Sequence, residues 1–423
     1  MNNNITPHHR FRRAAANVYM VLAVLVLAVF SSCSSDDTPK EPYHPNPDTY
    51  ENVVLVYAVG SNNLYGNLLS DKSEMLKGLK QTDPSKVKLL LLENIDPSNK
   101  GTQHSNILYE ARLSNETDEY EFVRLKEFDS DRYATEPAML TEAIEEMTKG
   151  FSSARYGIIF WSHGGGWAPA GYNTHIYPVQ DPSSALHPKP DTWWGVDESG
   201  SQHDQMNIDE LAAALPDNLL HFVWFDSCYM SGIELAYQLR NKARYLVAYP
   251  TEVHVFGLDY TTALPLILAP VPRLEEAART IYDFYTYTCL TQGVQTPVTV
   301  GVFDLEAIGD VAALARKAFT GYVKPSVSNL PKYTRGNILP MFDFREYLLS
   351  AAAASGNELD AEEVNRVFSR FTLCKYASER NFSNVLIDPA RYSGMSAHVY
   401  DPTNLGSNEN FFRSLDWFKA AYE

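Results

Sequence analysis

Apolar runs that stop at polar residues set the pattern of the first half of the chain. Each run is rich in Val, Ile, Leu or aromatic residues and has the length of one strand. Such near-continuous runs are typical of strands in a parallel sheet that is buried on both faces. The strands predicted in this way are Val53–Val59, Val87–Leu92, the run from Tyr156 to His163, His221–Phe225 and Tyr245–Ala248.

Segments with helical spacing of apolar residues separate these strands. Pro137 suits the first turn of one predicted helix, and Asn207 suits the N-cap of another. Ile107–Leu125 alternates in places and favours a hairpin at the edge of the sheet. Because strands alternate with helices, we predict an α/β fold in which a mostly parallel sheet is flanked by helices on both faces. The predicted helices are Leu64–Leu79, Glu136–Lys149 and Ile208–Leu215.

The second half of the chain mixes the two patterns less regularly. We predict a strand at Pro297–Leu305 and interpret residues 266–423 as an α+β C-terminal extension. The pattern leaves open whether this part extends the same domain or forms a subdomain packed on a core of residues 51–265. Its predicted helices are Leu274–Cys289, Val311–Tyr322, Ala361–Ser369 and Phe411–Tyr422.

The N-terminal residues carry the marks of a targeting segment. A basic stretch precedes an apolar core, Val18–Phe30, which is shorter than the roughly 20 residues of a spanning helix. The core ends in small residues and Cys33, which resembles a bacterial lipoprotein cleavage box. We therefore expect residues 1–33 to be a signal peptide that ends at a lipidated Cys33. The alternative is an ordinary secretory signal with an incidental cysteine.

A tether follows the predicted signal peptide. Residues 34–50 are rich in Pro and polar residues, which predicts a semi-extended spacer between the membrane and the folded domain. The acidic run after Cys33 resembles the surface-export signal of some Gram-negative lipoproteins. We expect an outer membrane lipoprotein of the cell envelope, exposed at the surface.

Two predicted strands end in residues that can form a nucleophile and its base. One runs through Asp226 and Ser227 to Cys228 and then into a helical pattern, and the other ends at His163. Carboxyl ends of parallel strands meet at one edge of a sheet, where α/β proteins bind ligands. A Cys near the start of a helix is favoured as a thiolate. We nominate Cys228 and His163 as catalytic; the alternative is that Cys228 is a small buried apolar residue.

These motifs resemble those of the clostripain-type cysteine peptidases, relatives of caspases, gingipains and legumain. The strand-His-Gly and strand-Asp-x-Cys patterns are similar, and the resemblance covers Asn52 to Tyr260 well and the rest loosely. It implies a caspase-like fold. Beyond the two motifs, the similar segments are Asn52–Leu64 with its Asn-Asn-Leu turn, Trp194–Leu215 between the His and Cys strands, Phe256–Tyr260 after the Cys, and Gly394–Asp401 as a small terminal strand.

The resemblance implies a cysteine endopeptidase with a Cys–His dyad. Cys228 would attack the scissile carbonyl to form a thioester, and His163 would protonate the leaving amine and then activate water. We expect the backbone N–H groups of Gly164 and Cys228 to hold the oxyanion, because glycine lets backbone approach a substrate closely. The pattern gives no third residue to orient the histidine.

Asp226 is the candidate for substrate specificity. In a strand, residues 226 and 228 point to the same side, so a carboxylate there can form the floor of a pocket for Arg or Lys. Family members with Asp at this position resemble Arg- or Lys-specific enzymes. The alternative is that Asp226 caps the following helix. Asp259, in the Phe256–Tyr260 segment, is a second candidate for the same pocket.

Charge and composition narrow the choice of partners. The formal net charge of −17 argues against nucleic acid and favours basic ligands at long range. No His, Cys or acidic spacing predicts a metal site, so no cofactor is required, and calcium at the acidic stretch from Asp197 to Glu210 stays open. Protein or peptide substrates and a membrane, reached through the lipid anchor, are the expected partners. The oligomeric state is not predicted.

Two other functions compete with the peptidase. His163–Gly166 also reads as the oxyanion support of a serine esterase, but the chain lacks the G-x-S-x-G motif that such enzymes need. A catalytically silent surface lipoprotein that binds a protein or a glycan is the other alternative, because a fold does not prove activity. The presence of both Cys228 and His163 argues against it.

Overall fold

A nine-stranded sheet forms the centre of the molecule. The computed structural model of the chain describes residues 49–96, 105–169, 194–199, 202–288, 291, 296–334, 340–382, 384–404 and 406–423, all within one compact unit. The strands of the sheet are β1 (Asn52–Val59), β2 (Val87–Ile95), β3 (Ser105–Leu113), β4 (Tyr120–Phe128), β5 (Tyr156–Trp161), β8 (Leu220–Asp226), β9 (Ala243–Ala248), β10 (Thr299–Asp304) and β12 (Thr372–Ala377).

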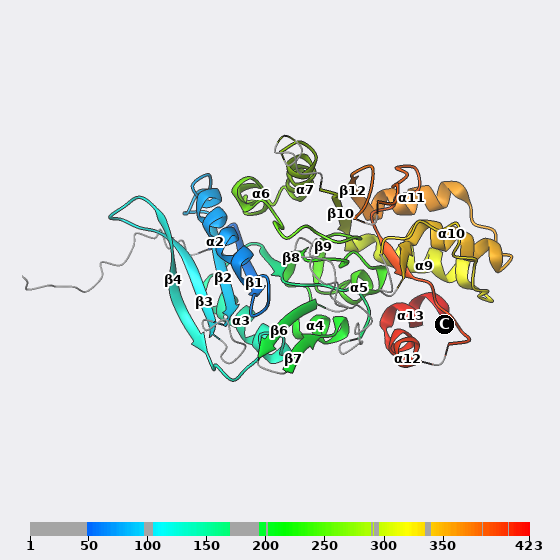
Figure 1. The fold of residues 1–423 in the computed structure, drawn as a ribbon, viewed down its shortest axis with the longest axis horizontal. Helices are drawn as coiled ribbons and strands as arrows, with labels where there is room; N and C mark the ends of the chain where they lie inside the picture. Colours follow the sequence, from blue (N-terminus) through cyan, green and yellow to red (C-terminus); the bar gives the residue numbers. More distant parts are fainter. Residues whose placement is uncertain are drawn as a thin grey trace, which may run out of the picture. The chain divides into compact units, whose positions relative to one another are not determined.

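The strand order confirms the predicted, mostly parallel sheet. It runs β12-β10-β9-β8-β5-β1-β2-β3-β4. Figure 1 shows the two edge strands, β4 and β12, on opposite sides of the molecule. The five central strands, from β9 to β2, are parallel to one another. Antiparallel strands continue the sheet on both sides, with the predicted hairpin, β3 and β4, at one edge.

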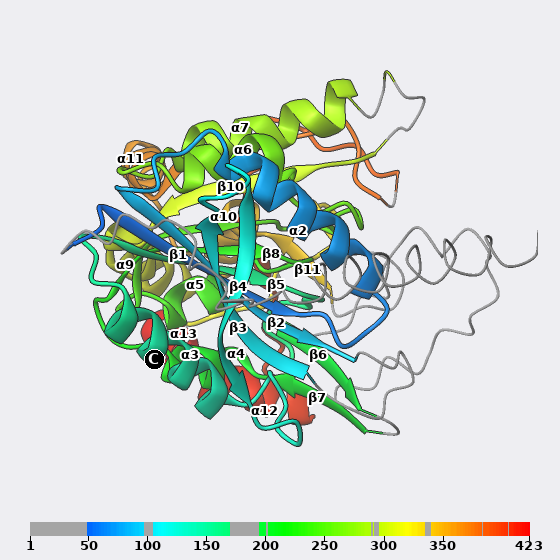
Figure 2. The same cartoon turned by 90° about the vertical axis from the view of Figure 1, so that its left-hand side faces the viewer.

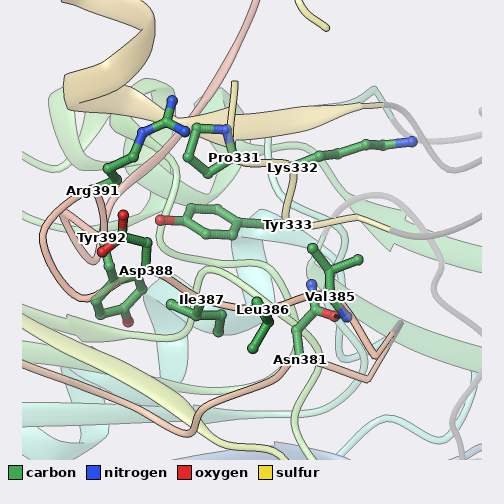
Figure 3. A pocket seen from close by; sticks show the side chains of 10 residues that line it. All are labelled: Pro331, Lys332, Tyr333, Asn381, Val385, Leu386, Ile387, Asp388, Arg391 and Tyr392. Carbon is green, nitrogen blue, oxygen red and sulfur yellow. Dashed lines mark hydrogen bonds between the residues drawn. The ribbon is translucent and has the colours of Figure 1, made fainter. Parts of the chain in front are cut away.

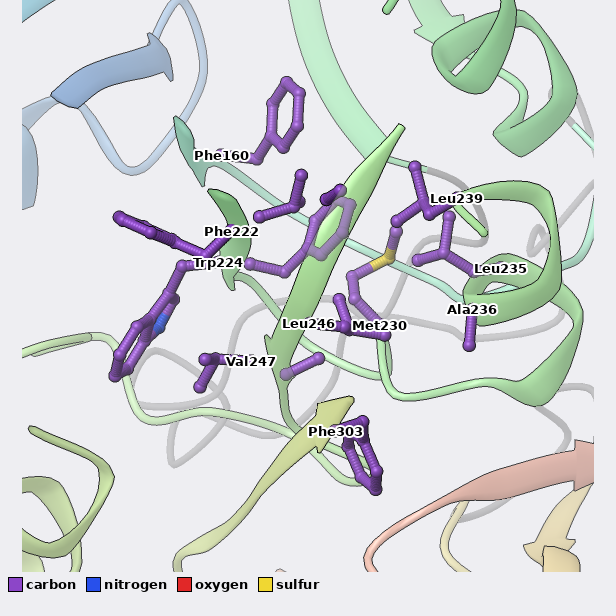
Figure 4. Packing of buried hydrophobic residues seen from close by; sticks show 14 of the residues in the cluster. Phe160, Phe222, Trp224, Met230, Leu235, Ala236, Leu239, Leu246, Val247 and Phe303 are labelled. Atoms are coloured by element: carbon purple, nitrogen blue, oxygen red, sulfur yellow. The ribbon is translucent and has the colours of Figure 1, made fainter. Parts of the chain in front are cut away.

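Burial on both faces explains why the central strands are apolar throughout. Every residue of β1 is buried, so this strand has no solvent face that would favour alternation. The core continues through β5, β8, β9 and β10 to α5 (Ile233–Gln238), as Figure 4 shows. Among the residues packed there are Phe160, Phe222, Trp224, Met230, Leu235, Leu246 and Phe303.

Helices cover the two faces of the sheet. Figure 2 shows α2, α6 and α7 on one face and α3, α4 and α5 on the other. The helices of the first part are α2 (Tyr65–Leu79), α3 (Pro137–Gly150), α4 (Ile208–Ala214), α5, α6 (Tyr260–Ile267) and α7 (Leu274–Asp283), which continues as a π-helix, η2 (Phe284–Thr288). Those of the C-terminal part are η3 (Leu305–Ala307), α9 (Ile308–Phe319), α10 (Phe344–Ala354), α11 (Ala361–Phe371), α12 (Ser407–Ser414) and α13 (Asp416–Tyr422).

The C-terminal part departs from the predicted elements in several places, and α10 is among the elements that were not predicted. The segment Phe411–Tyr422, predicted as one helix, is broken at Leu415, whose backbone is extended, into α12 and α13. Only Ser396–His398 of the predicted terminal strand Gly394–Asp401 is a strand, β13, and it pairs with the unpredicted β11 (Met341–Asp343) outside the main sheet. The edge strand β12 was also not predicted.

Residues beyond 265 are built into the sheet as well as packed on it. β10 pairs with β9, and β12 pairs with β10, so two strands of the main sheet come from the predicted extension. Close to the turn after β8, the Ser396 N–H donates to the carbonyl of Ser231 at 2.7 Å. The Ser231 hydroxyl donates to the carbonyl of Gly394, also at 2.7 Å. The C-terminal residues therefore hold the segment that follows Cys228.

Candidate active site

The parallel pairing of β5 and β8 brings His163 and Cys228 to the same edge of the sheet. Trp161 lies opposite Asp226 in the register, and each candidate follows its strand two residues later. Each is 5% exposed. A Cβ at Gly164 would lie 2.6 Å from the Cys228 carbonyl oxygen, so only glycine allows these two loops to pack this closely. The two backbone groups predicted to form the oxyanion hole therefore belong to segments in direct contact.

The turn that carries Cys228 has an unusual backbone. Tyr229, directly after Cys228, adopts the left-handed conformation with φ of 60°, which is rare for a bulky residue. Its N–H donates to the carbonyl of Thr251 at 3.0 Å, which fixes the turn on the segment after β9. The same segment reaches the thiol, because the Val253 N–H donates to the Cys228 Sγ at 3.3 Å. This strained turn is a feature that functional sites often hold.

His163 has a neutral partner. Its ring Nε2 lies 2.7 Å from the side-chain oxygen Oδ1 of Asn63, in the loop after β1. Burial lowers the pKa of His163 to about 4, because it disfavours the charged imidazolium. The ring is therefore neutral at pH 7, and a neutral ring is able to accept a proton from a thiol.

A two-stranded hairpin clamps the loop that carries His163. It consists of β6 (Trp194–Ser199) and β7 (Gln202–Met206). The Gly195 N–H donates to the His163 carbonyl at 3.0 Å, and the Val196 N–H donates to the Ser162 hydroxyl at 3.2 Å. The sequence match at Trp194–Leu215 pointed to this segment but did not reveal that it positions the histidine loop.

Asp226 is a buried carboxylate with one unused oxygen. Its Oδ2 accepts hydrogen bonds from the Leu258 N–H at 3.2 Å and from the Tyr260 hydroxyl at 3.1 Å. Its Oδ1 is buried and has no hydrogen-bond partner among the described residues. Burial is the main cause that raises the pKa of Asp226 to about 6. Asp226 does not cap the helix that follows, since the N-cap of α5 is Gly232.

Asp259, the second candidate for the pocket, has another role. It is the N-cap of α6, where its Oδ1 accepts from the Thr261 N–H at 3.2 Å and its Oδ2 from the Thr262 hydroxyl at 2.6 Å. Both oxygens are thus used locally. Asp259, and not Asp226, is therefore the aspartate that caps a helix.

A second buried acid near Asp226 was missed at the sequence level. Asp71 of α2 accepts a hydrogen bond from the Trp161 indole N–H at 2.7 Å. Burial, and then the charge of Asp226, raise the pKa of Asp71 to about 9, so it is protonated at neutral pH. A signal was present in the sequence, because Asp71 shares the buried stripe of α2 with Leu68 and Met75.

Metal sites, membrane-spanning helices and pockets were also sought among the described residues. They hold no group of three or more His, Cys, Asp or Glu side chains placed to bind a metal, and no helix long and apolar enough to cross a membrane. The pocket in Figure 3 is lined by residues of the C-terminal part, such as Tyr333 and Arg391, and by none of the predicted site residues. Cys33 and Cys289 lie outside the described residues.

Comparisons with solved structures place this fold among cysteine proteases. A secreted C11 cysteine protease from Bacteroides thetaiotaomicron, in complex with an irreversible peptide inhibitor, is similar with a TM-score of 0.70 and 23% identity over 88% of this chain and 99% of that chain. An inactive zymogen C11 protease from Parabacteroides distasonis has a TM-score of 0.70 and 21% identity over 89% of this chain and 99% of that one. A comparison with curated proteins gives no significant match.

The family model settles the class. Residues 56–335, which are more than half of the chain, match the model of the clostripain family, and the chain belongs to that family. It is accordingly a cysteine-type peptidase that acts on protein or peptide substrates. The resemblance drawn from the sequence motifs is confirmed.

Proposed function

We propose that the chain is an endopeptidase that uses Cys228 and His163 as a dyad and cleaves after Arg or Lys. The observation that carries the specificity is the unused oxygen of Asp226, buried two residues before Cys228. A buried carboxylate is costly unless it is paired, so a cationic side chain supplies what the site lacks. Arg and Lys both supply such a cation, and the unused Oδ1 can accept a charge-assisted hydrogen bond from either.

The proposed chemistry follows from the neutral histidine. The Cys228 thiol gives its proton to His163 as its sulfur bonds to the scissile carbonyl carbon, and backbone N–H groups of Gly164 and Cys228 stabilise the oxyanion. His163 then returns the proton to the amine as the C–N bond breaks, which leaves a thioester. Water, deprotonated by His163, hydrolyses the thioester and restores the thiol.

A panel of fluorogenic peptides tests this proposal. The full chain is assayed on peptides that end in Arg, Lys, Asp, Asn or Leu, beside Cys228→Ala and His163→Ala. Hydrolysis after Arg or Lys that both variants abolish is the expected result. Hydrolysis only after another residue would keep the dyad and remove the role of Asp226. A parallel arm with EGTA reports whether calcium is needed; the proposal is that the dyad needs no cofactor.

We also propose that the protein is an outer membrane lipoprotein anchored through Cys33 and exposed at the surface. The support is the basic stretch, short apolar core and small residues that precede Cys33. Incorporation of labelled palmitate into the wild-type chain, and its loss in Cys33→Ala, is the expected result. Equal labelling of the two chains would contradict the anchor without affecting the peptidase.

A further inference from the structure

We propose that Asn63 is a positioning residue for the peptidase reaction, which accepts a hydrogen bond from His163 Nε2–H and so leaves the Nδ1 lone pair for the thiol of Cys228. This inference rests on the proposed dyad. It starts from the 2.7 Å contact between the ring Nε2 and the Asn63 side-chain oxygen. The dyad of Cys228 and His163 does not by itself assign a role to the side chain of Asn63.

The chemistry of a neutral imidazole makes the contact selective. A neutral ring has one N–H donor and one acceptor nitrogen, and the hydrogen bond at one nitrogen decides which is which. An amide oxygen at Nε2 fixes the proton there. The nitrogen that must take the proton of the thiol is then Nδ1, and the ring enters the reaction in one tautomer.

A neutral acceptor also suits the burial of the ring. A carboxylate in place of Asn63 would favour the imidazolium and so raise the pKa of the ring, with part of the ring already protonated before it meets the thiol. Burial alone lowers the pKa of His163 to about 4, with no charged neighbour contributing. Asn63 therefore orients the ring without adding a charge that would shift its pKa.

The neighbouring residue, Asn62, makes the side-chain hydrogen bonds that shape the loop. The Asn62 amide group donates to the carbonyls of Val59 at 3.0 Å and Val196 at 2.8 Å. Its Oδ1 accepts from the Leu64 N–H at 2.8 Å. Asn62 thus fixes the turn between β1, the β6–β7 hairpin and α2, whereas Asn63 is an exposed residue whose side chain contacts the buried ring.

The tautomer can be measured without any turnover. In Cys228→Ala protein with ¹⁵N-labelled histidine, the His163 signals are identified by their loss on His163→Gln, and the shifts tell which ring nitrogen carries the proton. We expect the Nε2–H form, and a mixture of the two forms after Asn63→Ala. The Nδ1–H form, or spectra unchanged by Asn63→Ala, would overturn the inference even if the wild-type protein cleaves its peptides.

Kinetics then separate positioning from loop structure. We expect Asn63→Ala to lower kcat about 10- to 100-fold with KM nearly unchanged, as a wrong tautomer removes proton transfer but not binding. Asn63→Asp keeps an acceptor, so it should recover part of kcat while its charge moves the acidic limb of the pH profile upward. Asn62→Ala is the matched control, which should lower the melting temperature without moving that limb. An Asn63→Ala enzyme within twofold of wild type would refute the role of Asn63.

Discussion

Asp226, beside the candidate active site, and Asp343, in the C-terminal part, are two similar aspartates that differ in how their oxygens are used. Each is the last residue of a strand, each is buried, and burial raises the pKa of each. The Oδ2 of Asp343 accepts from the Tyr333 hydroxyl at 2.5 Å and from the Ser393 N–H at 2.6 Å. Its Oδ1 accepts from the Glu346 N–H at 3.0 Å, which caps α10. The Oδ1 of Asp226 has no such partner among the described residues.

The difference separates a carboxylate whose two oxygens are both used by the protein from one that we propose binds a substrate side chain. At Asp343, the protein itself supplies donors to both oxygens, so the group holds β11, α10 and the residues before β13 together. At Asp226, the fold bears the cost of burial and leaves half of the carboxylate unsatisfied. Residue type, burial and the direction of the pKa shift do not distinguish the two sites; the unpaired oxygen does.

Replacing Asp226 by Asn should have the largest effect on activity. We expect kcat/KM for Arg and Lys peptides to fall about 100-fold, since a hydrogen bond to a charged group is worth roughly 1.5–3 kcal/mol. Stability should change in the opposite direction. The pKa of Asp226 is raised from 3.8 to about 6 in the folded state, so its ionised form opposes folding at pH 7 by on the order of 2–3 kcal/mol.

Urea unfolding and peptide kinetics on the same Asp226→Asn sample check both arms. The gain in free energy of unfolding should be largest at pH 7 and should shrink as the pH falls below about 6, where the wild-type carboxyl becomes protonated. If Asp226→Asn lowered both stability and activity, Asp226 would be a structural carboxylate like Asp343, and the proposed difference between the two would be wrong.

Asp343→Ala should do the reverse. It leaves three donors without their acceptor and removes the cap of α10, which we expect to lower the free energy of unfolding by about 2–4 kcal/mol. The kcat/KM of the molecules that stay folded should remain within about twofold of wild type, because Asp343 is no part of the proposed catalytic machinery. Unfolding curves in urea, with activity measured at low denaturant, decide the matter. A selective loss of activity after Arg would contradict the structural role.

The pH dependence of the wild-type enzyme should show the smallest effect. Asp226 loses its charge as the pH falls through about 6, so kcat/KM for an Arg peptide should be about tenfold lower at pH 5 than at pH 7, mainly through KM. The control is the rate at which a small neutral reagent alkylates Cys228. We expect this rate to have no step near pH 6 that depends on Asp226, so wild type and Asp226→Asn should give the same pH profile there. If the pH profile of kcat/KM fell only near pH 4, protonation of His163 rather than of Asp226 would explain the loss of activity.

The sequence predicted those parts of the fold that depend on the residues of a single strand or helix. Apolar runs predicted the central strands, because strands buried on both faces have no polar side, and the same runs placed Cys228 and His163 at strand ends. Edge elements were harder: β12 is only half-buried and reads as an ordinary polar segment. The helix break at Leu415 likewise depends on how α12 and α13 pack.

Contacts between distant residues were beyond the sequence pattern. Asn63 meets His163 across 100 positions of the chain, and Asp71 meets Trp161 across 90. Nothing local to Asn63 distinguishes it from Asn62, yet one contacts the ring and the other the backbone. Asp226 was the first and Asp259 the second candidate for the pocket, and only the fold showed which of them caps a helix.

The way the C-terminal residues enter the sheet has a consequence for biosynthesis. The edge of β9 stays unpaired until β10 has been made, and β10 in turn awaits β12. At about 5–20 residues per second, translation from Ala248 to Thr299 leaves this edge open for several seconds. The turn after Cys228 receives its bonds from Gly394 and Ser396 later still. A nascent chain of this design therefore acquires all the hydrogen bonds of the turn after Cys228 only once residue 396 has been made.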